Sequence, residues 1–170
     1  LVLHCLGLDR DQIDHGMASF AGLPHRLQTV ATLGPISFIN DSKATNGTAA
    51  ANAIAAFSHI YWIAGGLAKE DGLEAVMPHI GNVKKAYLIG NSATAFAKTL
   101  HGQCDTGIYD NLHDATRAAF DDAKDNVNGG TILLAPAAAS FDQFDNFGAR
   151  GDAFCQLARQ LCGQKGEIYA

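Results

Sequence analysis

Apolar residues recur along this chain at two spacings, and together these predict an α/β fold. Short β-type runs, typical of buried strands, cover residues 36–39, 59–64, 86–89, 107–109 and 131–134. Between the runs, apolar residues recur at i, i+3, i+4 and i+7, the period of one helix face. This spacing predicts helices over 50–57, 73–80, 93–100 and 112–124, and a last one with Phe154, Leu157, Ala158 and Leu161 on its buried face.

Alternating strands and helices favour a Rossmann-like, mostly parallel sheet with helices on both faces. Residues 25–32 alternate loosely and are followed by the turn signal Gly34-Pro35, so we predict an antiparallel edge strand that pairs with 36–39. Residues 1–20 contain two short helical stretches and no strand. We therefore expect 1–20 to be a connector or the tail of a preceding domain, and 21–170 to form one domain. Because the chain begins at Leu1 rather than Met, we expect a fragment of a longer protein.

Composition and charge exclude several classes of protein. The chain has 170 residues, of which 48% are hydrophobic and 17% charged, so it is neither disordered nor fibrous. Its net charge of −5 and the lack of a basic stripe argue against a nucleic-acid partner. No apolar run is long enough to span a membrane. The four cysteines show no metal-ligand spacing, so we expect buried, reduced thiols in a cytoplasmic protein.

A polar cluster, Asn40-Asp41-Ser42-Lys43-Ala44-Thr45-Asn46, lies between a predicted strand and a predicted helix. Ligands of open α/β sheets bind beyond the carboxyl ends of the strands. A helix N-terminus also favours an anion, and Lys43 and Thr45 add a charge and a hydroxyl. In the alternative interpretation, Asp41, Thr45 or Asn46 only caps the helix.

Three further stretches carry candidate site residues. Gly65-Gly66 ends a strand, and Lys69 follows it, so Lys43 and Lys69 would share one sheet edge if their strands are adjacent and parallel. Two converging lysines imply an anionic ligand. Arg26, just after a turn, suits a phosphate or carboxylate, or is a surface residue, and His25 is either a contact at the same site or a surface histidine.

The third stretch is Ser140-Phe141-Asp142-Gln143. Serine followed three residues later by glutamine is a capping-box pattern, so Ser140 is a helix cap, a ligand contact or both. Phe141, Phe144 and Phe147 follow closely, either as core residues or as a flat wall beside a ligand. Arg150-Gly151-Asp152 is expected to open the last helix, with Asp152 as its N-cap.

The sequence contains only part of a recognisable active site. It has neither a G-x-x-x-x-G-K-[ST] phosphate loop nor a G-x-G-x-x-G turn after a strand. No Ser/His/Asp or Cys/His arrangement for a nucleophile stands out. We therefore expect this chain alone to contain only half of an active site.

The heptapeptide at 40–46, in register with Gly22-Leu23-Pro24-His25-Arg26, Gly65-Gly66 with Lys69, and Ser140 to Gly151, resembles the C-terminal domain of the Mur ligase family. Within that family, the amino-acid sequence of residues 40–46 resembles that of the bacterial enzymes that add D-glutamate to UDP-N-acetylmuramoyl-L-alanine in peptidoglycan biosynthesis. The four matches cover about 130 residues. Family members have three domains, and residues 21–170 resemble the third, the amino-acid-binding domain. Residues 1–20 would then be a connector or the tail of the central ATPase domain.

The resemblance implies an ATP-dependent ligase that forms an amide through an acyl phosphate. The isolated chain would then neither form the amide nor hydrolyse ATP. D-glutamate would be bound by Lys43, Thr45, Lys69, Ser140, Phe141 and Phe147. At position 141 either the ring or only the backbone would serve the pocket. Arg26 and Asp41 would reach the nucleotide across the domain interface, with His25 and Asn46 in support. ATP, Mg²⁺ and UDP-N-acetylmuramoyl-L-alanine would be held mainly by the other domains, so no metal ligand is assigned here.

Two other interpretations remain open. The chain could be a stand-alone Rossmann-like module that binds another anion or a nucleotide at Lys43 and Lys69. It could also belong to a sister Mur ligase that takes a different amino acid.

Overall fold

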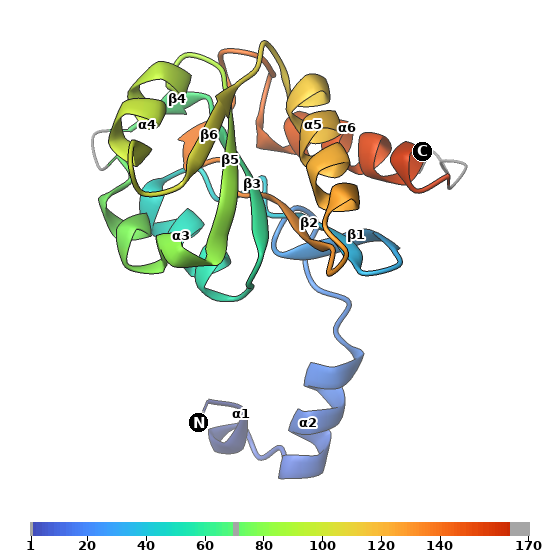
Figure 1. Cartoon of the computed structure of the whole chain (residues 1–170). Helices are drawn as coiled ribbons and strands as arrows, with labels where there is room; N and C mark the ends of the chain where they lie inside the picture. The colour runs from blue at the N-terminus through green and yellow to red at the C-terminus, as the bar shows by residue number, and fades with distance from the viewer. Residues whose placement is uncertain (1, 70–71, 164–170) are drawn as a thin grey trace.

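The computed structural model describes residues 2–69 and 72–163, and it confirms the predicted α/β fold (Figure 1). The main sheet has six strands in the order β1-β2-β7-β3-β5-β6. Their bounds are Gln28–Leu33 (β1), Ile36–Asn40 (β2), Ile60–Gly65 (β3), Val83–Ile89 (β5), Asp105–Ile108 (β6) and Gly130–Leu134 (β7). A second, two-stranded sheet pairs β4 (Leu67–Ala68) with β8 (Ala138–Ala139).

Six α-helices and one long 3₁₀ helix accompany these strands in the described residues. They are α1 (Val2–Cys5), α2 (Arg10–Ser19), α3 (Gly47–Ala55), the 3₁₀ helix η1 (Glu74–Asn82), α4 (Ala93–Leu100), α5 (Leu112–Asp125) and α6 (Phe147–Leu161). Within these residues, no helix is long and apolar enough to cross a membrane.

The pairing of the strands decides where the loops meet. β1 runs antiparallel to β2, as the Gly34-Pro35 turn predicted, whereas the pairs β2–β7, β7–β3, β3–β5 and β5–β6 are all parallel. β2 and β3 are separated by β7, which comes from much later in the chain. The carboxyl ends of these parallel strands therefore lie along a single edge of the sheet.

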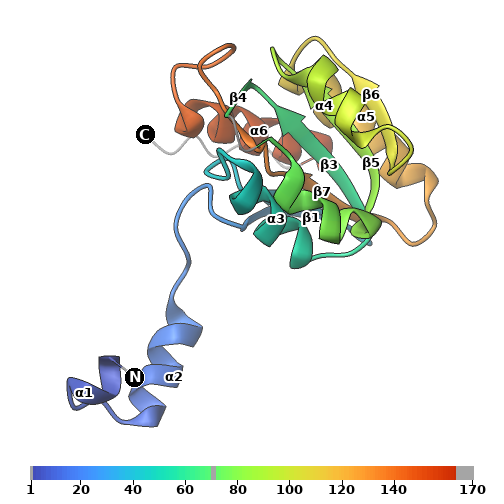
Figure 2. The same ribbon diagram turned by 90° about the vertical axis from the view of Figure 1, so that its left-hand side faces the viewer.

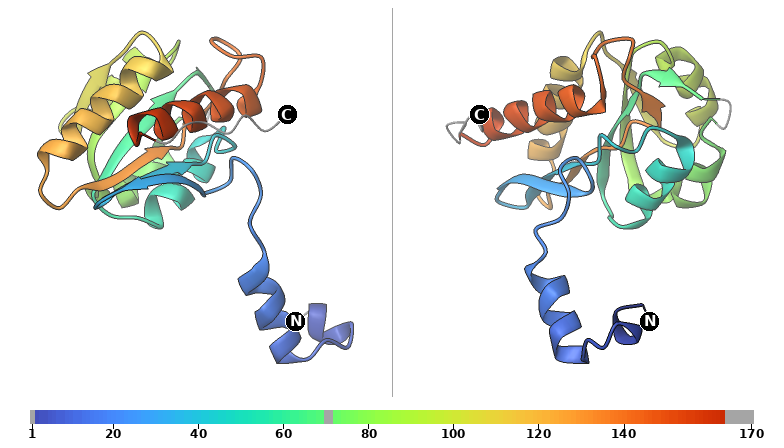
Figure 3. Two further views of the ribbon diagram at one scale, coloured as in Figure 1. Left: turned by 90° about the vertical axis from the view of Figure 1, so that its right-hand side faces the viewer. Right: turned by 180° about the vertical axis from the view of Figure 1, so that it is seen from behind.

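Helices cover both faces of the sheet, and the strand residues alternate between them. In β3, Ile60, Trp62 and Ala64 pack on the side of α3, η1 and α4, whereas Tyr61 and Ile63 pack on the side of α5 and α6. Figure 2 shows the first group of helices in front of the sheet, and the left panel of Figure 3 shows α5 and α6 across the other face. Because both faces of the sheet are buried at its centre, the central strands β3 and β7 are almost entirely apolar, which is why their runs were recognisable in the sequence.

The first two helices stand apart from the sheet (Figure 1). Neither α1 nor α2 has a buried residue, and Met17 and Phe20 are largely exposed. Asp9 caps α2 through a capping box with Gln12, so its start depends on local hydrogen bonds. The division of the chain at residues 20 and 21 remains a prediction.

Two predicted helices differ from the structure in extent or type. The helix after the heptapeptide ends at Ala55, so Phe57 lies beyond it. Residues 74–82 form a 3₁₀ helix rather than an α-helix, although Leu73, Val76 and Ile80 are buried as their spacing indicated. Pro78 lies inside this segment, lacks an N–H and restricts the backbone of the preceding residue, which disfavours a regular α-helix.

The last helix begins earlier than predicted. α6 starts at Phe147, and the side chain of Asn146 caps it by accepting from the backbone N–H of Ala149 at 2.9 Å. Asp152 is therefore an exposed residue inside the helix, and its assignment as the N-cap was wrong. An Asn and an Asp six residues apart both suit an N-cap, and the chain uses the first of them.

The prediction of buried thiols was correct only in part. All four cysteines are free: Cys155 is buried, Cys104 and Cys162 are half-buried, and Cys5 is exposed on α1.

Candidate functional site

The candidate site residues follow three neighbouring parallel strands at the carboxyl edge of the sheet. Lys43 follows β2, Lys69 follows β3 by way of the short strand β4, and Ser140 follows β7 by way of β8. The structure therefore places Lys43 and Lys69 at the same edge. Their strands are parallel but not adjacent, because β7 lies between them.

Backbone hydrogen bonds hold these three loops together. The N–H of Asp41 donates to the carbonyl of Leu134 at 2.8 Å, and the N–H of Ala137 donates to the carbonyl of Ala44 at 3.0 Å. The N–H of Gly65 donates to the carbonyl of Pro136 at 2.8 Å. Residues 134–137 thus connect the polar heptapeptide to the glycine pair.

Glycine is required at 65 and 66 because the chain segments approach closely here. Gly65 has φ of +122° and Gly66 has φ of +133°, in the region that favours glycine. A Cβ at Gly65 would overlap the carbonyl oxygen of Ile89, and one at Gly66 would overlap that of Ala139. The pair therefore lets β4 turn back over the sheet edge and pair with β8.

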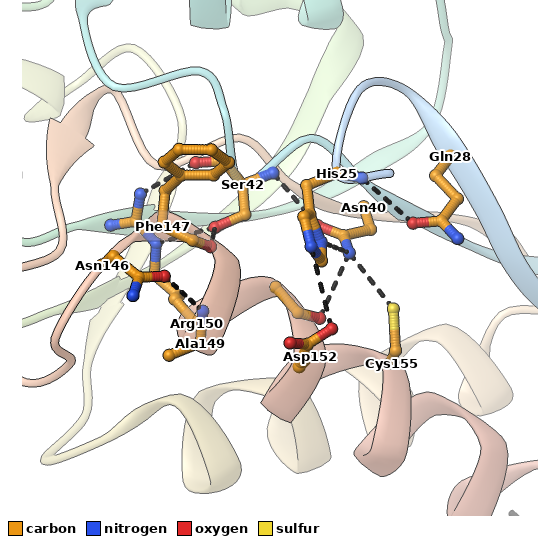
Figure 4. Close-up of polar contacts among 11 residues, drawn as sticks. His25, Gln28, Asn40, Ser42, Asn146, Phe147, Ala149, Arg150, Asp152 and Cys155 are labelled. Carbon is orange, nitrogen blue, oxygen red and sulfur yellow. Dashed lines mark hydrogen bonds and ion pairs between the residues drawn. The ribbon is translucent and has the colours of Figure 1, made fainter. Parts of the chain in front are cut away.

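Asn40, the last residue of β2, connects the heptapeptide to α6 (Figure 4). Its side-chain oxygen accepts from the N–H of Ser42 at 3.0 Å. Its side-chain nitrogen lies 3.0 Å from Nδ1 of His25, 3.1 Å from the carbonyl of Gly151 and 3.1 Å from Sγ of Cys155. A Cβ at Gly151 would overlap the His25 ring, so this glycine lets the ring lie against α6.

Arg150 makes a second connection, from inside α6. It is 1% exposed, and its Nε donates to Oγ of Ser42 at 3.0 Å, while its terminal nitrogens donate to the carbonyls of Ser42 and Ala138 at 3.0–3.1 Å. Burial lowers the pKa of Arg150 to about 10, and nearby Asp142 partly opposes this shift. The guanidinium thus ties the heptapeptide to β8.

Lys43 lies on an aromatic ring. Its Nζ is 4.2 Å from the ring centroid of Phe147, the first residue of α6, and its backbone N–H donates to the carbonyl of His25 at 3.1 Å. The His25 ring meets the Phe147 ring edge to face, with centroids 6.1 Å apart, and its Nε2 lies 3.7 Å from a carboxylate oxygen of Asp152. The structure therefore brings together three residues predicted for the site, namely His25, Lys43 and Phe147.

Asp41 and Arg26 lie close together beside this group. Asp41 is 9% exposed, and its carboxylate accepts from the N–H of Leu27 at 3.2 Å, which fixes the loop that carries the exposed Arg26. Burial raises the pKa of Asp41, and the hydrogen bond from Leu27 and the charge of Arg26 oppose that shift. His25 and Leu27 have φ of 61° and 44°, so this loop has an unusual backbone.

Asn46 is the helix cap that the alternative interpretation allowed. Its side-chain oxygen accepts from the N–H of Ala49 at 2.8 Å at the start of α3. Thr45 beside it is half-buried, and Lys69 is exposed at the same sheet edge. Asp41 does not cap α3, because its carboxylate bonds to the loop of residues 25–28 instead.

Ser140 does not begin a capping box. No helix starts here, and the backbone carbonyl of Ser140 accepts from the N–H groups of Gln143 and Phe144 in a tight turn. Its hydroxyl is buried and, among the described residues, has no hydrogen-bond partner. Phe141 is 69% exposed, which does not fit the core-packing interpretation, whereas Phe144 packs against the core beneath α5 and α6.

Two further observations concern a surface groove and metal binding. A groove of about 330 Å³ lies between the start of α5 and α6, and of the residues considered for the site only Phe144 lines it. In the described part of the chain, no group of three or more His, Cys, Asp or Glu side chains is arranged to hold a metal ion.

Sequence reasoning did not assign Asn40, Ser42 and Arg150 to the site. Asn40 and Ser42 stand inside the heptapeptide at 40–46, in which only Asp41, Lys43, Thr45 and Asn46 were given roles. Arg150 lies four and eight positions before Phe154 and Ala158 on the buried face of α6, and that spacing was a signal that its side chain is buried.

The chain is similar in sequence to a protein family and to several known proteins. Residues 25–138 match the family model described as Mur ligase, glutamate ligase domain. The chain is 55% identical over 161 residues to a UDP-N-acetylmuramoylalanine–D-glutamate ligase of Dinoroseobacter shibae and 51% identical over 156 residues to one of Cereibacter sphaeroides. In each case the match covers 92% of this chain and 33% of the relative.

A more distant relative and a solved structure extend the match. A protein of Wolbachia pipientis with the same name is 44% identical over 160 residues, which are 94% of this chain and 31% of that protein. The crystal structure of a murein peptide ligase from Psychrobacter arcticus superposes with a TM-score of 0.56 at 10% identity, over 91% of this chain and 33% of that one, and so supports the fold alone. This chain spans about a third of the length of these relatives, and it belongs to the Mur ligase family through its glutamate ligase domain.

Proposed function

We propose that this chain is the amino-acid-binding domain of a cytoplasmic, ATP-dependent ligase that adds D-glutamate to UDP-N-acetylmuramoyl-L-alanine in peptidoglycan biosynthesis. The observation that carries the proposal is that Lys43, Lys69 and Ser140 follow three parallel strands at one edge of the sheet. The names of relatives that are 44–55% identical support the choice of D-glutamate.

The chemistry of this edge suits a small dicarboxylate. Two ammonium groups provide charge-assisted hydrogen bonds to carboxylates, and the hydroxyls of Thr45 and Ser140 provide further donors. The hydroxyl of Ser140 is buried without a partner in the described residues, and such a group gains stability when it meets a polar ligand atom or water. Phe141, exposed beside Ser140, would cover the bound amino acid through its ring or its backbone.

The domain's contribution to the reaction is the position of the amine. In the proposed reaction, the amine of D-glutamate attacks the acyl phosphate of the second substrate, forms the amide bond, loses a proton and releases phosphate. Fixing both carboxylates orients the amine toward that carbon, and such positioning lowers the barrier by reducing the entropy lost in the reaction.

The described residues fit ATP and Mg²⁺ to different degrees. Arg26 is exposed next to Asp41, and its guanidinium suits a nucleotide phosphate on a facing domain. No described cluster fits a metal ion, so no step through Mg²⁺ is assigned to this chain. We propose that both are bound mainly by the other domains.

The test uses the complete enzyme that contains this chain and measures phosphate release with each substrate varied in turn. Lys69→Ala is expected to raise the KM for D-glutamate at least tenfold, the loss of about 1.4 kcal/mol, while the KM for ATP changes less than twofold. Lys84→Ala is the matched control, because Lys84 is an exposed lysine near the amino end of β5, at the opposite edge of the sheet.

Three results would contradict the proposal. Equal rises in the KM values for D-glutamate and ATP would show that Lys69 does not belong to the amino-acid site. A preference for a diamino acid or L-glutamate would indicate a sister ligase. Failure of the complete enzyme to form any amide would favour a module that only binds anions.

A further inference from the structure

The Lys43 ammonium is held by an aromatic ring rather than by a carboxylate. Its Nζ lies over the Phe147 ring at 4.2 Å from the centroid, well within the range of a cation–π contact. In the described residues, no Asp or Glu oxygen lies within ion-pair distance of this nitrogen. The ring is therefore the contact that orients the charged end of Lys43.

The ring itself is held from two sides. The hydroxyl of Ser42 donates to the backbone carbonyl of Phe147 at 2.7 Å and so fixes the start of α6 against the heptapeptide. The His25 ring packs against the Phe147 ring at an interplanar angle of 79°. Figure 4 shows Ser42 beside Phe147 and His25 next to them. Contacts within the chain itself thus hold the aromatic face in place.

The other end of Lys43 is fixed as well. Its backbone N–H donates to the carbonyl of His25 at 3.1 Å. The same residue, His25, therefore holds the Lys43 backbone and packs against the ring beneath the ammonium. A lysine side chain loses much rotational freedom when its charge is used, and contacts at both ends reduce that loss on binding.

We propose that Phe147 is a positioning residue that acts through Lys43: the face of its ring holds the ammonium ready for a carboxylate of the ligand. A carboxylate partner would orient the lysine too, but it would compete with an anionic ligand. An aromatic face attracts the cation through its quadrupole and leaves the full positive charge available. The inference rests on the proposed function and assigns to the ring a task other than that of a pocket wall.

The test compares Phe147→Leu and Phe147→Tyr in the complete enzyme. Leucine keeps the apolar bulk and removes the ring, so we expect the KM for D-glutamate to rise about 2- to 30-fold, the range that cation–π strengths cover. Tyrosine keeps the ring and should restore a KM near that of the original enzyme. The kcat and the KM for ATP should change much less in both variants.

Phe144→Leu is the matched control, because it removes a ring from the same stretch that packs against the core, away from Lys43. It should leave the KM for D-glutamate unchanged. In a Lys43→Met background, Phe147→Leu should have no further effect on that KM, because the group through which it acts is gone.

The possible failures are distinguishable. If the original enzyme shows no turnover that depends on D-glutamate, the proposed function is wrong. If turnover is normal but the Leu and Tyr variants have the same KM, or if Phe147→Leu has its full effect without Lys43, the ring does not act through the ammonium. A fall in unfolding midpoint with equal changes in both KM values would show a purely structural role.

Discussion

Replacing Arg150 by methionine tests how the structure holds its site together. The change keeps an unbranched side chain of similar length and removes the donors that reach Ser42 and Ala138. The carbonyls of both residues lose a charged donor inside the protein. The heptapeptide then loses its side-chain connection to β8.

Two opposing effects set the size of the loss. Burial lowers the pKa of Arg150 to about 10, and a shift of that size corresponds to roughly 3 kcal/mol against the charged form. Hydrogen bonds with a charged partner stabilise by about 1.5–3 kcal/mol each, and Arg150 donates four. The hydrogen bonds outweigh the cost of burial, so we expect Arg150→Met to lower the free energy of unfolding by about 3–5 kcal/mol.

Urea unfolding followed by tryptophan fluorescence measures this loss. Trp62 is the single tryptophan, is fully buried and donates to the carbonyl of Ala135 at 2.8 Å, so its emission reports the core of the sheet. Arg159→Met on the same helix is the control, with an expected change within about 0.5 kcal/mol. Arg150→Lys should fall between, because it keeps the charge without the planar fork. If Arg150→Met is as stable as the control, the network does not stabilise the fold.

Two further predictions concern other parts of the sheet. Gly65→Ala should lower the free energy of unfolding by about 3 kcal/mol or more, because its Cβ would overlap a backbone carbonyl of β5. Gly81→Ala, in open space, is the control and should change it by no more than about 1 kcal/mol. Similar urea midpoints for the two variants would refute this prediction. Asp122 accepts from Lys85 at 2.7 Å and Tyr87 at 2.6 Å; burial raises its pKa, but these bonds outweigh burial and lower it overall. The resulting stability is present above the unfolded-state pKa and is lost as the pH falls through the folded-state value. Asp122→Asn should therefore cost about 1 kcal/mol at neutral pH and less in acid, and a gap independent of pH would contradict this reasoning.

The sequence predicted the kinds of elements well and their ends less well. Periodicity identified the buried strands and most helices because each strand or helix buries its own face, and that requirement is local. The predicted capping residues were wrong at Ser140 and Asp152. Ser140, Asn146 and Asp152 all have side chains that can cap a helix, and only Asn146 does so for α6. A cap depends on one or two hydrogen bonds, and which residue makes them depends on where the rest of the fold ends the preceding loop.

Some features of the candidate site could likewise be predicted from the sequence, and others could not. The sequence by itself determined that Lys43, Lys69 and Ser140 stand after strands, and parallel pairing of alternating elements brings such positions to one edge. Tertiary structure alone decided that β7 separates β2 from β3, that Arg150 is buried against Ser42, and that the Lys43 ammonium lies on the Phe147 ring. Ser42 and Arg150 are 108 positions apart, and no local pattern encodes such a contact. It forms because α6 packs across the sheet and buries the guanidinium beside Ser42 and Ala138, which accept its hydrogen bonds.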